Sequence, residues 1–304
     1  MKHSIYHVII ILAALVTSCD SLDVKGMFFS SGSHTEDRVA DWLAWNDQHG
    51  PNIIENAPDN YRVFFCSDPH LNNDFSRLDT YLHKVYTDPM SLFCVVNGDI
   101  ANEAGERPYR VLDSLTHCAR PYNHIPTPGE DTCFAVIGNH DIYFDCQQYY
   151  QQYFHTSTYS VEVRTQNGNK DLFVFLDSGN ATFGKRQTKW LKELLHRNKE
   201  YRHIVVTTHT SLFRTTYNYS TTPAANMPQD EAYALFDLLD RNNVDLFVMG
   251  HFHYREEHQI GNVRYVMTNN LNDTEETPTY LVVSCGDNID YKYEYLTGDF
   301  HISD

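Results

Sequence analysis

Basic residues are scarce in this sequence of 304 residues. Lysine and arginine together number 23, against 40 aspartates and glutamates, and the formal net charge at pH 7 is −17. A surface with this balance repels polyanions, so broad electrostatic binding of nucleic acid is not expected. Bound metal ions could still create a local positive pocket, because a divalent cation is often the largest charge in its site.

Apolar runs long enough to cross a membrane are also absent. An unbroken apolar run covers only residues 8–16, whereas a membrane span needs roughly 20 residues. The run follows Lys2 and ends in small and polar residues, which is typical of a secretory signal peptide. The sequence Leu-Val-Thr-Ser-Cys at residues 15–19 also resembles a bacterial lipobox, in which a lipid is attached to the cysteine.

This N-terminal pattern predicts export and lipid anchoring. We expect residues 1–18 to be a signal peptide and Cys19 to carry a lipid. The protein would then be held at a bacterial membrane, on its periplasmic or cell-surface side. An ordinary cleaved signal peptide with an incidental cysteine is the alternative.

The six remaining cysteines show no regular spacing. Cys66, Cys94, Cys133 and Cys285 lie inside apolar runs, where a free cysteine behaves as a small hydrophobic residue. Irregular spacing argues against a zinc cluster. Export would permit disulfides, but the sequence indicates no particular pair.

Apolar runs rich in β-branched and aromatic residues alternate with helix-like segments. The expected buried strands are 63–66, 92–96, 133–137, 172–176, 204–206 and 246–249, with a further group of strands at 280–285 and 291–295. The expected helices are 36–46, 74–86, 187–196 and 229–241. We therefore expect one α/β domain over residues 59–304, preceded by a tether and a short helix at residues 19–58.

Polar side chains follow five of these runs at the point where each run ends. They are Asp68 and His70, then Asp99, then Asn139 with His140 and Asp141, then His209, and last His251 with His253. Sites in open α/β sheets form at the carboxyl ends of strands, and mixtures of carboxylate and imidazole bind zinc, iron and manganese. One such side chain could cap a turn or sit in the core, but five sets in succession indicate a metal site.

In chain order the motifs read Asp-x-His, Gly-Asp, Gly-Asn-His-Asp, a single His and Gly-His-x-His, and they span Asp68 to His253. This set resembles the calcineurin-like metallophosphoesterase superfamily. The resemblance implies a four-layer α/β sandwich, in which two mixed β-sheets are flanked by helices. It also implies an enzyme that hydrolyses a small phosphate ester, a phosphodiester or a phosphomonoester, with two divalent metal ions such as manganese, iron or zinc.

The same resemblance implies a role for each motif residue. One metal takes Asp68, His70, Asp99 and His253, and the other takes Asp99, Asn139, His209 and His251. Asp99 then bridges the two metals, and the hydroxide that they share attacks phosphorus. His140 stabilises the transition state or protonates the leaving oxygen, and Asp141 orients His140.

The sequence departs from two branches of this superfamily. Protein phosphatases place an Arg shortly after the residue that matches Asp99, and purple acid phosphatases place a Tyr just after it. Neither residue is present here. A cation that holds the phosphate is therefore expected elsewhere. Arg214 is the candidate nearest in sequence to an expected ligand and lies in a Ser/Thr-rich loop over residues 210–228, with Arg107 and Arg110 as alternatives.

Three other functions stay open on the sequence alone. The chain could be a catalytically silent surface lipoprotein that keeps the fold for binding, a nuclease of the same superfamily, or a purely structural surface lipoprotein. The acidic balance argues against the nuclease, because nucleic-acid binding needs a basic groove. Measuring the metal content of the purified protein would distinguish the structural lipoprotein from the enzymes.

Overall fold

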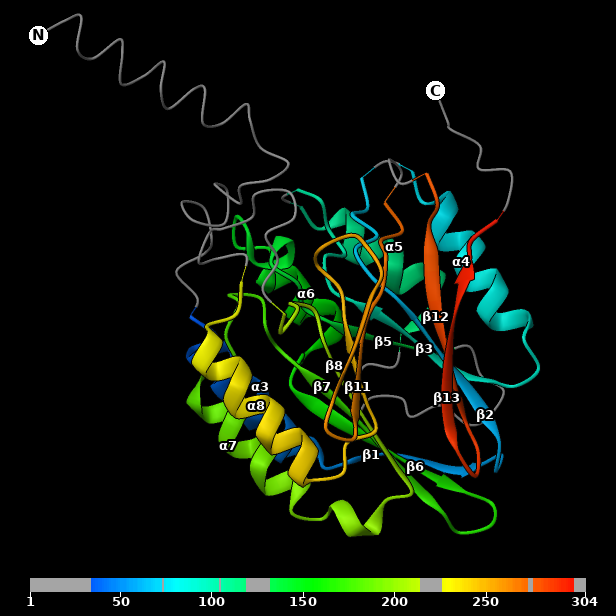
Figure 1. The fold of residues 1–304 in the computed structure, drawn as a ribbon. Helices are drawn as coiled ribbons and strands as arrows, with labels where there is room; N and C mark the ends of the chain where they lie inside the picture. The colour runs from blue at the N-terminus through cyan, green and yellow to red at the C-terminus, as the bar shows by residue number, and fades with distance from the viewer. Residues whose placement is uncertain are drawn as a thin grey trace, which may run out of the picture.

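The computed structural model describes residues 34–72, 74–103, 105–118, 132–213, 226–272 and 276–297. Two mixed β-sheets lie face to face, and helices cover the two outer faces (Figure 1). One apolar layer fills the space between the sheets, and two more lie beneath the helices. The expected four-layer α/β sandwich is confirmed.

The first sheet has seven strands within the described residues. In spatial order they are β1 (Asn52–Ala57), β6 (Tyr159–Thr165), β7 (Lys170–Leu176), β8 (His203–Thr208), β9 (Leu246–Met249), β11 (Val263–Met267) and β10 (Glu256–Ile260). The central strands β7, β8, β9 and β11 are parallel to one another. Such strands are buried on both faces, which explains why most of them read as continuous apolar runs.

The second sheet has six strands within the same residues. In spatial order they are β13 (Ile289–Tyr295), β12 (Thr279–Cys285), β2 (Tyr61–Cys66), β3 (Ser91–Asn97), β5 (Thr132–Val136) and β4 (His117–Cys118). Strands β2, β3 and β5 are parallel, so their carboxyl ends point to one edge. The two C-terminal strands join this sheet in antiparallel fashion.

Helices of both outer layers bury one apolar face each. Against the six-stranded sheet lie α4 (Ser76–Thr87), α5 (Arg107–Leu115) and α6 (Gln147–Phe154). Against the seven-stranded sheet lie α7 (Gly184–Leu195) and α8 (Gln229–Arg241). Two short 3-10 turns, η1 (His140–Ile142) and η2 (Asn198–Glu200), also lie within the described residues.

Residues 35–57 belong to the folded unit, so the expected domain start at residue 59 was too late. Helix α3 (Thr35–His49) packs against α7, and it buries Val39 and Trp42. Strand β1 then pairs in parallel with β6 at the edge of the seven-stranded sheet. The short helix expected at 36–46 is therefore part of the sandwich, because Trp42 packs in the apolar layer beneath α6, 6.2 Å from the centre of the Tyr150 ring.

A buried ion pair ties α3 to the loop that follows β7. Arg38 Nε and Nη2 each donate to a carboxylate oxygen of Asp177 at 3.0 Å, and the two side chains are only 4% and 0% exposed. Arg38 Nη1 also donates to Asn180 Oδ1 at 2.7 Å. Paired parallel bonds of this kind combine charge assistance with a fixed geometry.

Arg38→Ala should lower the free energy of unfolding by about 3–5 kcal/mol, because Asp177 would stay buried without its counter-charge. Thermal and urea denaturation measure this loss. Arg241→Ala is the matched control, since Arg241 pairs with Asp237 at the surface of α8, where the side chains are 75% and 57% exposed. That pair should contribute about 1 kcal/mol or less. Equal losses in the two variants would show that the Arg38 pair does not stabilise the fold.

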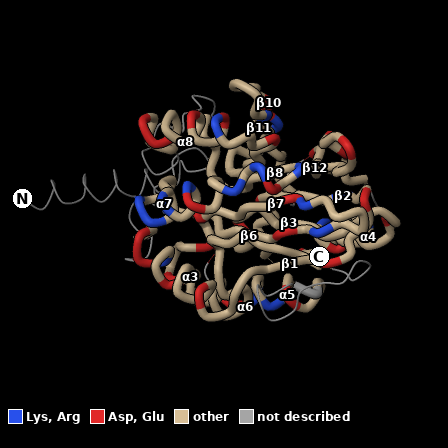
Figure 2. The backbone as a smooth tube through the Cα atoms, turned by 90° about the horizontal axis from the view of Figure 1, so that it is seen from below, with Lys and Arg blue, Asp and Glu red and all other residues tan. Residues whose placement is uncertain are grey.

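Acidic residues occur on helices of both outer layers, and lysines and arginines are scattered among them along the chain (Figure 2). The net charge of −17 therefore belongs to a mixed surface and not to one acidic face. An anionic ligand gains little from such a surface as a whole. Its recognition depends on charges close to the site.

Candidate metal centre

The carboxyl ends of strands from both sheets meet at one edge of the sandwich. Strands β2, β3 and β5 of one sheet and β8 and β9 of the other end there. The predicted ligands follow directly: Asp68 and His70 after β2, Asp99 after β3, Asn139 after β5, His209 after β8, and His251 and His253 after β9. Asp68, His70, Asp99, Asn139 and His209 are buried, and the last two histidines are half-buried.

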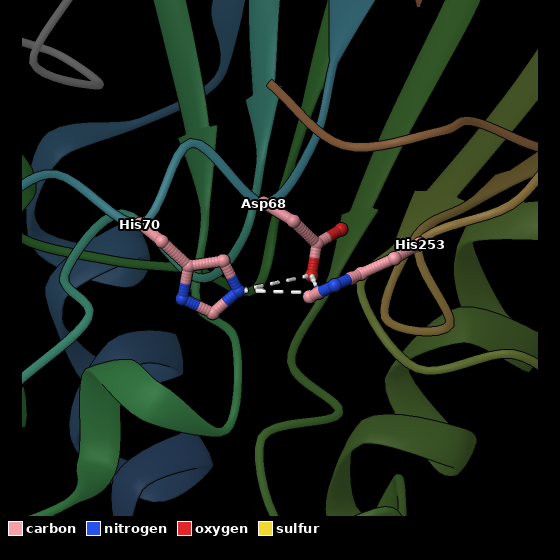
Figure 3. A group of neighbouring side chains, drawn as sticks. All are labelled: Asp68, His70 and His253. Carbon is pink, nitrogen blue, oxygen red and sulfur yellow. Dashed lines mark hydrogen bonds and ion pairs between the residues drawn. The ribbon is translucent and has the colours of Figure 1, made fainter. Parts of the chain in front are cut away.

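One group of ligand atoms is formed by Asp68, His70 and His253, whose side chains point toward one another (Figure 3). His253 Nε2 lies 3.1 Å from Asp68 Oδ1 and 3.2 Å from His70 Nε2. His70 Nε2 is 3.8 Å from the same carboxylate oxygen. Three donor atoms that converge on a common point within 4.8 Å of one another can bind one metal ion.

A second group is formed by Asp99, His209 and His251, again with donor atoms within 4.8 Å of one another. His209 Nε2 lies 3.3 Å from Asp99 Oδ2 and 3.1 Å from Asn139 Oδ1. The amide nitrogen of Asn139 donates to Tyr143 Oη at 2.8 Å, which turns the amide oxygen toward the group. Asn139 can therefore act as a neutral oxygen ligand.

Asp99 lies between the two groups. Its Oδ2 atom is 3.3 Å from His209 Nε2 and 3.7 Å from His70 Nε2. Its other oxygen accepts a hydrogen bond from the backbone N–H of His140 at 2.8 Å. One carboxylate oxygen is thus held by the backbone, while the other faces imidazoles of both groups.

The backbone is strained where it carries these side chains. Five of the predicted ligand positions have positive φ angles: Asp68 (51°), His70 (44°), Asp99 (51°), His251 (79°) and His253 (59°). Such conformations cost roughly 1–3 kcal/mol each for residues with side chains and tend to occur at functional sites. Because alternate residues of an extended strand face opposite sides, His251 and His253 can both face the site only on a kinked turn of this kind.

Two glycines permit the close approach of the segments. Gly98 has a φ of 86°, and a Cβ atom there would overlap the His209 ring. A Cβ atom on Gly138 would overlap the carboxylate of Asp99. Glycine is needed at both positions because only hydrogen fits where the neighbouring ligand passes.

The electrostatics of the cluster favour bound cations. Burial raises the pKa of Asp68, but His209 and His253 outweigh it and hold that pKa below its usual range. Burial also raises the pKa of Asp99, and His209 and His140 hold it well below its usual range. Conversely, burial lowers the pKa of His209, but Asp99 and Asp68 raise it to about 10. Two buried carboxylates require compensating positive charge, which divalent cations can supply.

His140 lies beside the cluster and is held by the backbone. Its Nδ1 atom is 2.9 Å from the carbonyl oxygen of Asn102, which can only accept a hydrogen bond. In the neutral ring Nδ1 must therefore carry the proton, so that Nε2 faces Asp99 Oδ2 at 4.0 Å. The His140 side chain is 26% exposed, so a ligand can reach Nε2 from outside.

The expectation that Asp141 orients His140 is wrong. The Asp141 carboxylate accepts bonds from the backbone N–H groups of Gly138 at 2.8 Å and Ala101 at 3.1 Å, and from Tyr109 Oη at 3.0 Å. It thereby joins the loops that carry Asn139 and Asp99, because each loop donates to the same carboxylate. Asp141 is a positioning residue, and Asn102 supplies the bond that the sequence assigned to it.

Three hydrogen bonds at the site are not predicted by the sequence. The carbonyl oxygens of Asn97 and Asn102 accept from His209 and His140, each at 2.9 Å, and Tyr143 accepts from Asn139. Backbone carbonyls leave no signal in a sequence. Tyr143 does leave one, because it stands four residues after Asn139 on a short turn.

The remaining predicted site residues differ in what the structure shows of them. Arg214 and Cys19 fall outside the described residues. Arg107 and Arg110 lie exposed on α5, where the Arg107 guanidinium is 5.2 Å from the centre of the Phe75 ring. His140 forms a third group of donor atoms with His70 and Asp99, so its geometry alone does not separate a proton donor from a ligand.

A family model described as calcineurin-like phosphoesterase matches residues 61–255, about two thirds of the chain. The protein belongs to this family of phosphoesterases. The buried clusters of histidine and aspartate at the sheet edges are consistent with the two-metal site typical of the family. No curated protein matches the sequence significantly.

Solved structures share the fold at low sequence identity. A dimetal phosphatase from Danio rerio matches with a TM-score of 0.58 and 10% identity, over 79% of this chain and 97% of that one. A purple acid phosphatase from yellow lupin has a TM-score of 0.58 and 15% identity, over 81% of this chain and 53% of that one.

A third structure has the same fold, but its description is that of an anchor protein. GAP50, described as the anchor in the inner membrane complex of Plasmodium, matches with a TM-score of 0.56 and 15% identity, over 80% of this chain and 86% of that one. Phosphatases and an anchor thus share this architecture. The fold alone does not decide between catalysis and binding.

Proposed function

We propose that the protein is a phosphoric ester hydrolase that works with two divalent metal ions. The observation that carries the proposal is the position of Asp99, which faces one group of donor atoms on each side. One ion would be held by Asp68, His70, Asp99 and His253, and the other by Asp99, Asn139, His209 and His251. Carboxylate, amide and imidazole donors suit manganese, iron or zinc.

Such a pair of ions supplies two effects when bound: it lowers the pKa of a water molecule and neutralises charge on the ester oxygens. The protein's own groups supply the rest. His140 can hold a proton on Nε2 and pass it to the leaving oxygen, since its Nδ1 is fixed on the Asn102 carbonyl. Asp141 and the two glycines keep the ligands at fixed separations.

The competing proposal is a catalytically silent surface lipoprotein that keeps the fold for binding. It gains support from the anchor that shares this fold. Against it stands the completeness of the site, because each predicted ligand and His140 lies within the cluster or beside it. A protein without turnover has no need of a partly exposed imidazole held beside the complete ligand set.

Metal analysis followed by a panel of phosphate esters tests the proposal. The purified protein should contain close to two metal ions per chain and should hydrolyse at least one phosphomonoester or phosphodiester with Mn²⁺, Fe²⁺ or Zn²⁺. Bound metal without any turnover would favour the silent lipoprotein. Absence of tightly bound metal would contradict the assignment of the cluster as a metal centre.

We further propose that the protein is exported and anchored by a lipid on Cys19. The proposal rests on the N-terminal apolar run and the lipobox-like residues 15–19. No helix in the described ranges combines the length and apolar character needed to cross a bilayer. A small phosphate ester would then be met outside the cytoplasm, with Arg214 as a candidate for contacting its phosphate.

Cys19→Ala should move the protein from the membrane fraction to the soluble fraction and abolish labelling by fatty acids, because the acyl chains supply the binding energy. Fractionation of cells and metabolic labelling measure the two effects. Cys66→Ala is the control, since Cys66 is buried in the core and is not available to a lipid. Unchanged membrane association of the Cys19 variant would reject the anchor.

A further inference from the structure

Arg255 lies at the same edge of the molecule as the predicted metal ligands, two residues after His253. It precedes β10, whose first residue, Glu256, pairs with Met267 at the end of β11. Met267 in turn pairs with Met249 at the end of β9, just before the turn that carries the two histidines. The register therefore places Arg255 at the metal-side end of the seven-stranded sheet.

Two tyrosines of the other sheet hold the guanidinium of Arg255. Its Cζ atom lies 5.3 Å from the ring centre of Tyr293 and 5.4 Å from that of Tyr295, and Nη2 is 3.4 Å from Tyr295 Oη. Tyr295 pairs with Thr279 at the start of β12, which runs antiparallel to β2. It therefore stands at the edge where Asp68 follows β2. Cation–π contacts fix a guanidinium without neutralising its charge.

The charge of Arg255 is not cancelled within the described part of the chain. No ion pair joins it to a carboxylate there, whereas Arg264, on the neighbouring strand, pairs with Asp290 at 3.6 Å. An exposed arginine without a carboxylate partner is notable in a chain with 40 acidic and 23 basic residues. Such a group is available to an anion from solution.

An open cavity of about 560 Å³ adjoins this guanidinium and is lined by Arg255, Glu256, Glu257 and Tyr293. Both glutamates already have partners. The Glu256 carboxylate lies 2.9 Å from the His258 ring, and Glu257 accepts a hydrogen bond from Tyr291 at 2.9 Å. The cavity therefore holds one guanidinium beside two carboxylates, and only Nη2 of that guanidinium has a hydrogen-bond partner within the described residues.

We propose that Arg255 recognises a second anionic group of the substrate, a phosphate or a carboxylate on the part of the ester that is not hydrolysed. The inference rests on the proposed hydrolysis of phosphate esters. The planar guanidinium matches both anions through paired hydrogen bonds. The preferred substrates are then esters with at least two anionic groups, and simple esters of uncharged alcohols bind less well.

Binding of matched phosphonates to the metal-loaded full chain tests the proposal by titration calorimetry. One series, the ω-phosphonoalkanoates, carries a carboxylate at the far end of two to five methylene groups. A second series carries another phosphonate there, and a third, the alkylphosphonates, carries no second anion. The wild type should bind one of the doubly charged series roughly 10-fold or more tightly than the third, and Arg255→Ala should lose that difference. The preferred series identifies the anion.

Arg264→Ala is the matched control. Arg264 stacks on Tyr291 at 5.4 Å in the same manner, but it pairs with Leu246 at the opposite end of β9, away from the metal ligands. Its loss should leave the preference for the second anion unchanged, whatever it does to the melting temperature. An equal loss of preference in both variants would show that Arg255 only joins the two sheets, and would overturn the proposal.

Turnover by the wild type tests the proposed function separately. If the wild type hydrolyses esters and Arg255→Ala binds every phosphonate as the wild type does, the inference about Arg255 fails while the hydrolase stands. If the wild type hydrolyses no ester but Arg255→Ala still loses the selective binding, the hydrolase fails and the anion site stands.

Discussion

Asp99→Asn is expected to abolish measurable turnover and to weaken the binding of both metal ions. The substitution keeps the shape of the side chain, and the amide oxygen can still accept from the backbone N–H of His140, as Asp99 Oδ1 does at 2.8 Å. The amide nitrogen then replaces Oδ2, the oxygen that faces His209 and His70. An amide NH₂ cannot bind a cation, so both sites lose the ligand that they share.

The loss in kcat should exceed the roughly 10²–10³-fold seen when one preorganised electrostatic group is removed, because both metal sites are weakened together. Metal content by mass spectrometry should fall for both ions together. Asp88→Asn serves as the control, because Asp88 pairs with Arg62 away from the cluster, where its side chain is 18% exposed. Two tightly bound ions and a normal rate in the Asp99 variant would end the two-metal assignment.

His140→Ala should keep both metal ions and lower kcat by about 10²–10⁴-fold, the usual contribution of a positioned general acid. The reason is geometric. Its Nδ1 is fixed on the Asn102 carbonyl, which leaves Nε2 of this partly exposed side chain as the atom that can exchange a proton with substrate. KM should change less than kcat, because the proton transfer occurs only in the transition state.

The same variant separates two roles that the geometry of His140 allows. Its donor atom also lies within 4.8 Å of those of His70 and Asp99, so it could bind a metal. Metal loss, with the rate restored by excess metal, would make His140 a ligand and contradict the proton-donor role. His83→Ala is the control, since His83 is an exposed histidine on α4.

The central strands and the order of the predicted ligands could be read from the sequence. Strands at 63–66, 92–96 and 246–249 were found because a strand covered on both faces needs an unbroken apolar run. Helix α8 begins and ends at the residues expected, Gln229 and Arg241. These features depend on residues close together in the chain, which a one-dimensional pattern records.

Elements at the edges of the fold were not predicted, because they depend on contacts with residues far away in the chain. Strand β10 has the sequence Glu-Glu-His-Gln-Ile and is mostly exposed, so it carries no apolar signal. It forms because β11 offers an unpaired edge. Helix α6 is rich in glutamine and tyrosine, and only Tyr150 and Phe154 are buried against the six-stranded sheet. In both cases tertiary contacts outweigh local preference.

The sequence by itself determined which side chains stand at the ends of the buried strands, in what order, and that their chemistry suits divalent metal ions. Only the tertiary structure decided that these strands belong to two different sheets and that Asp99 lies between the two groups. It also showed that the Asn102 carbonyl, and not Asp141, is the hydrogen-bond partner of His140. The contact of Arg255 with Tyr293 and Tyr295 likewise appears only in the structure. The physical reason is that side-chain chemistry is a local property. Strand register and backbone hydrogen bonds instead join residues far apart in the chain and leave no mark on the residues they join.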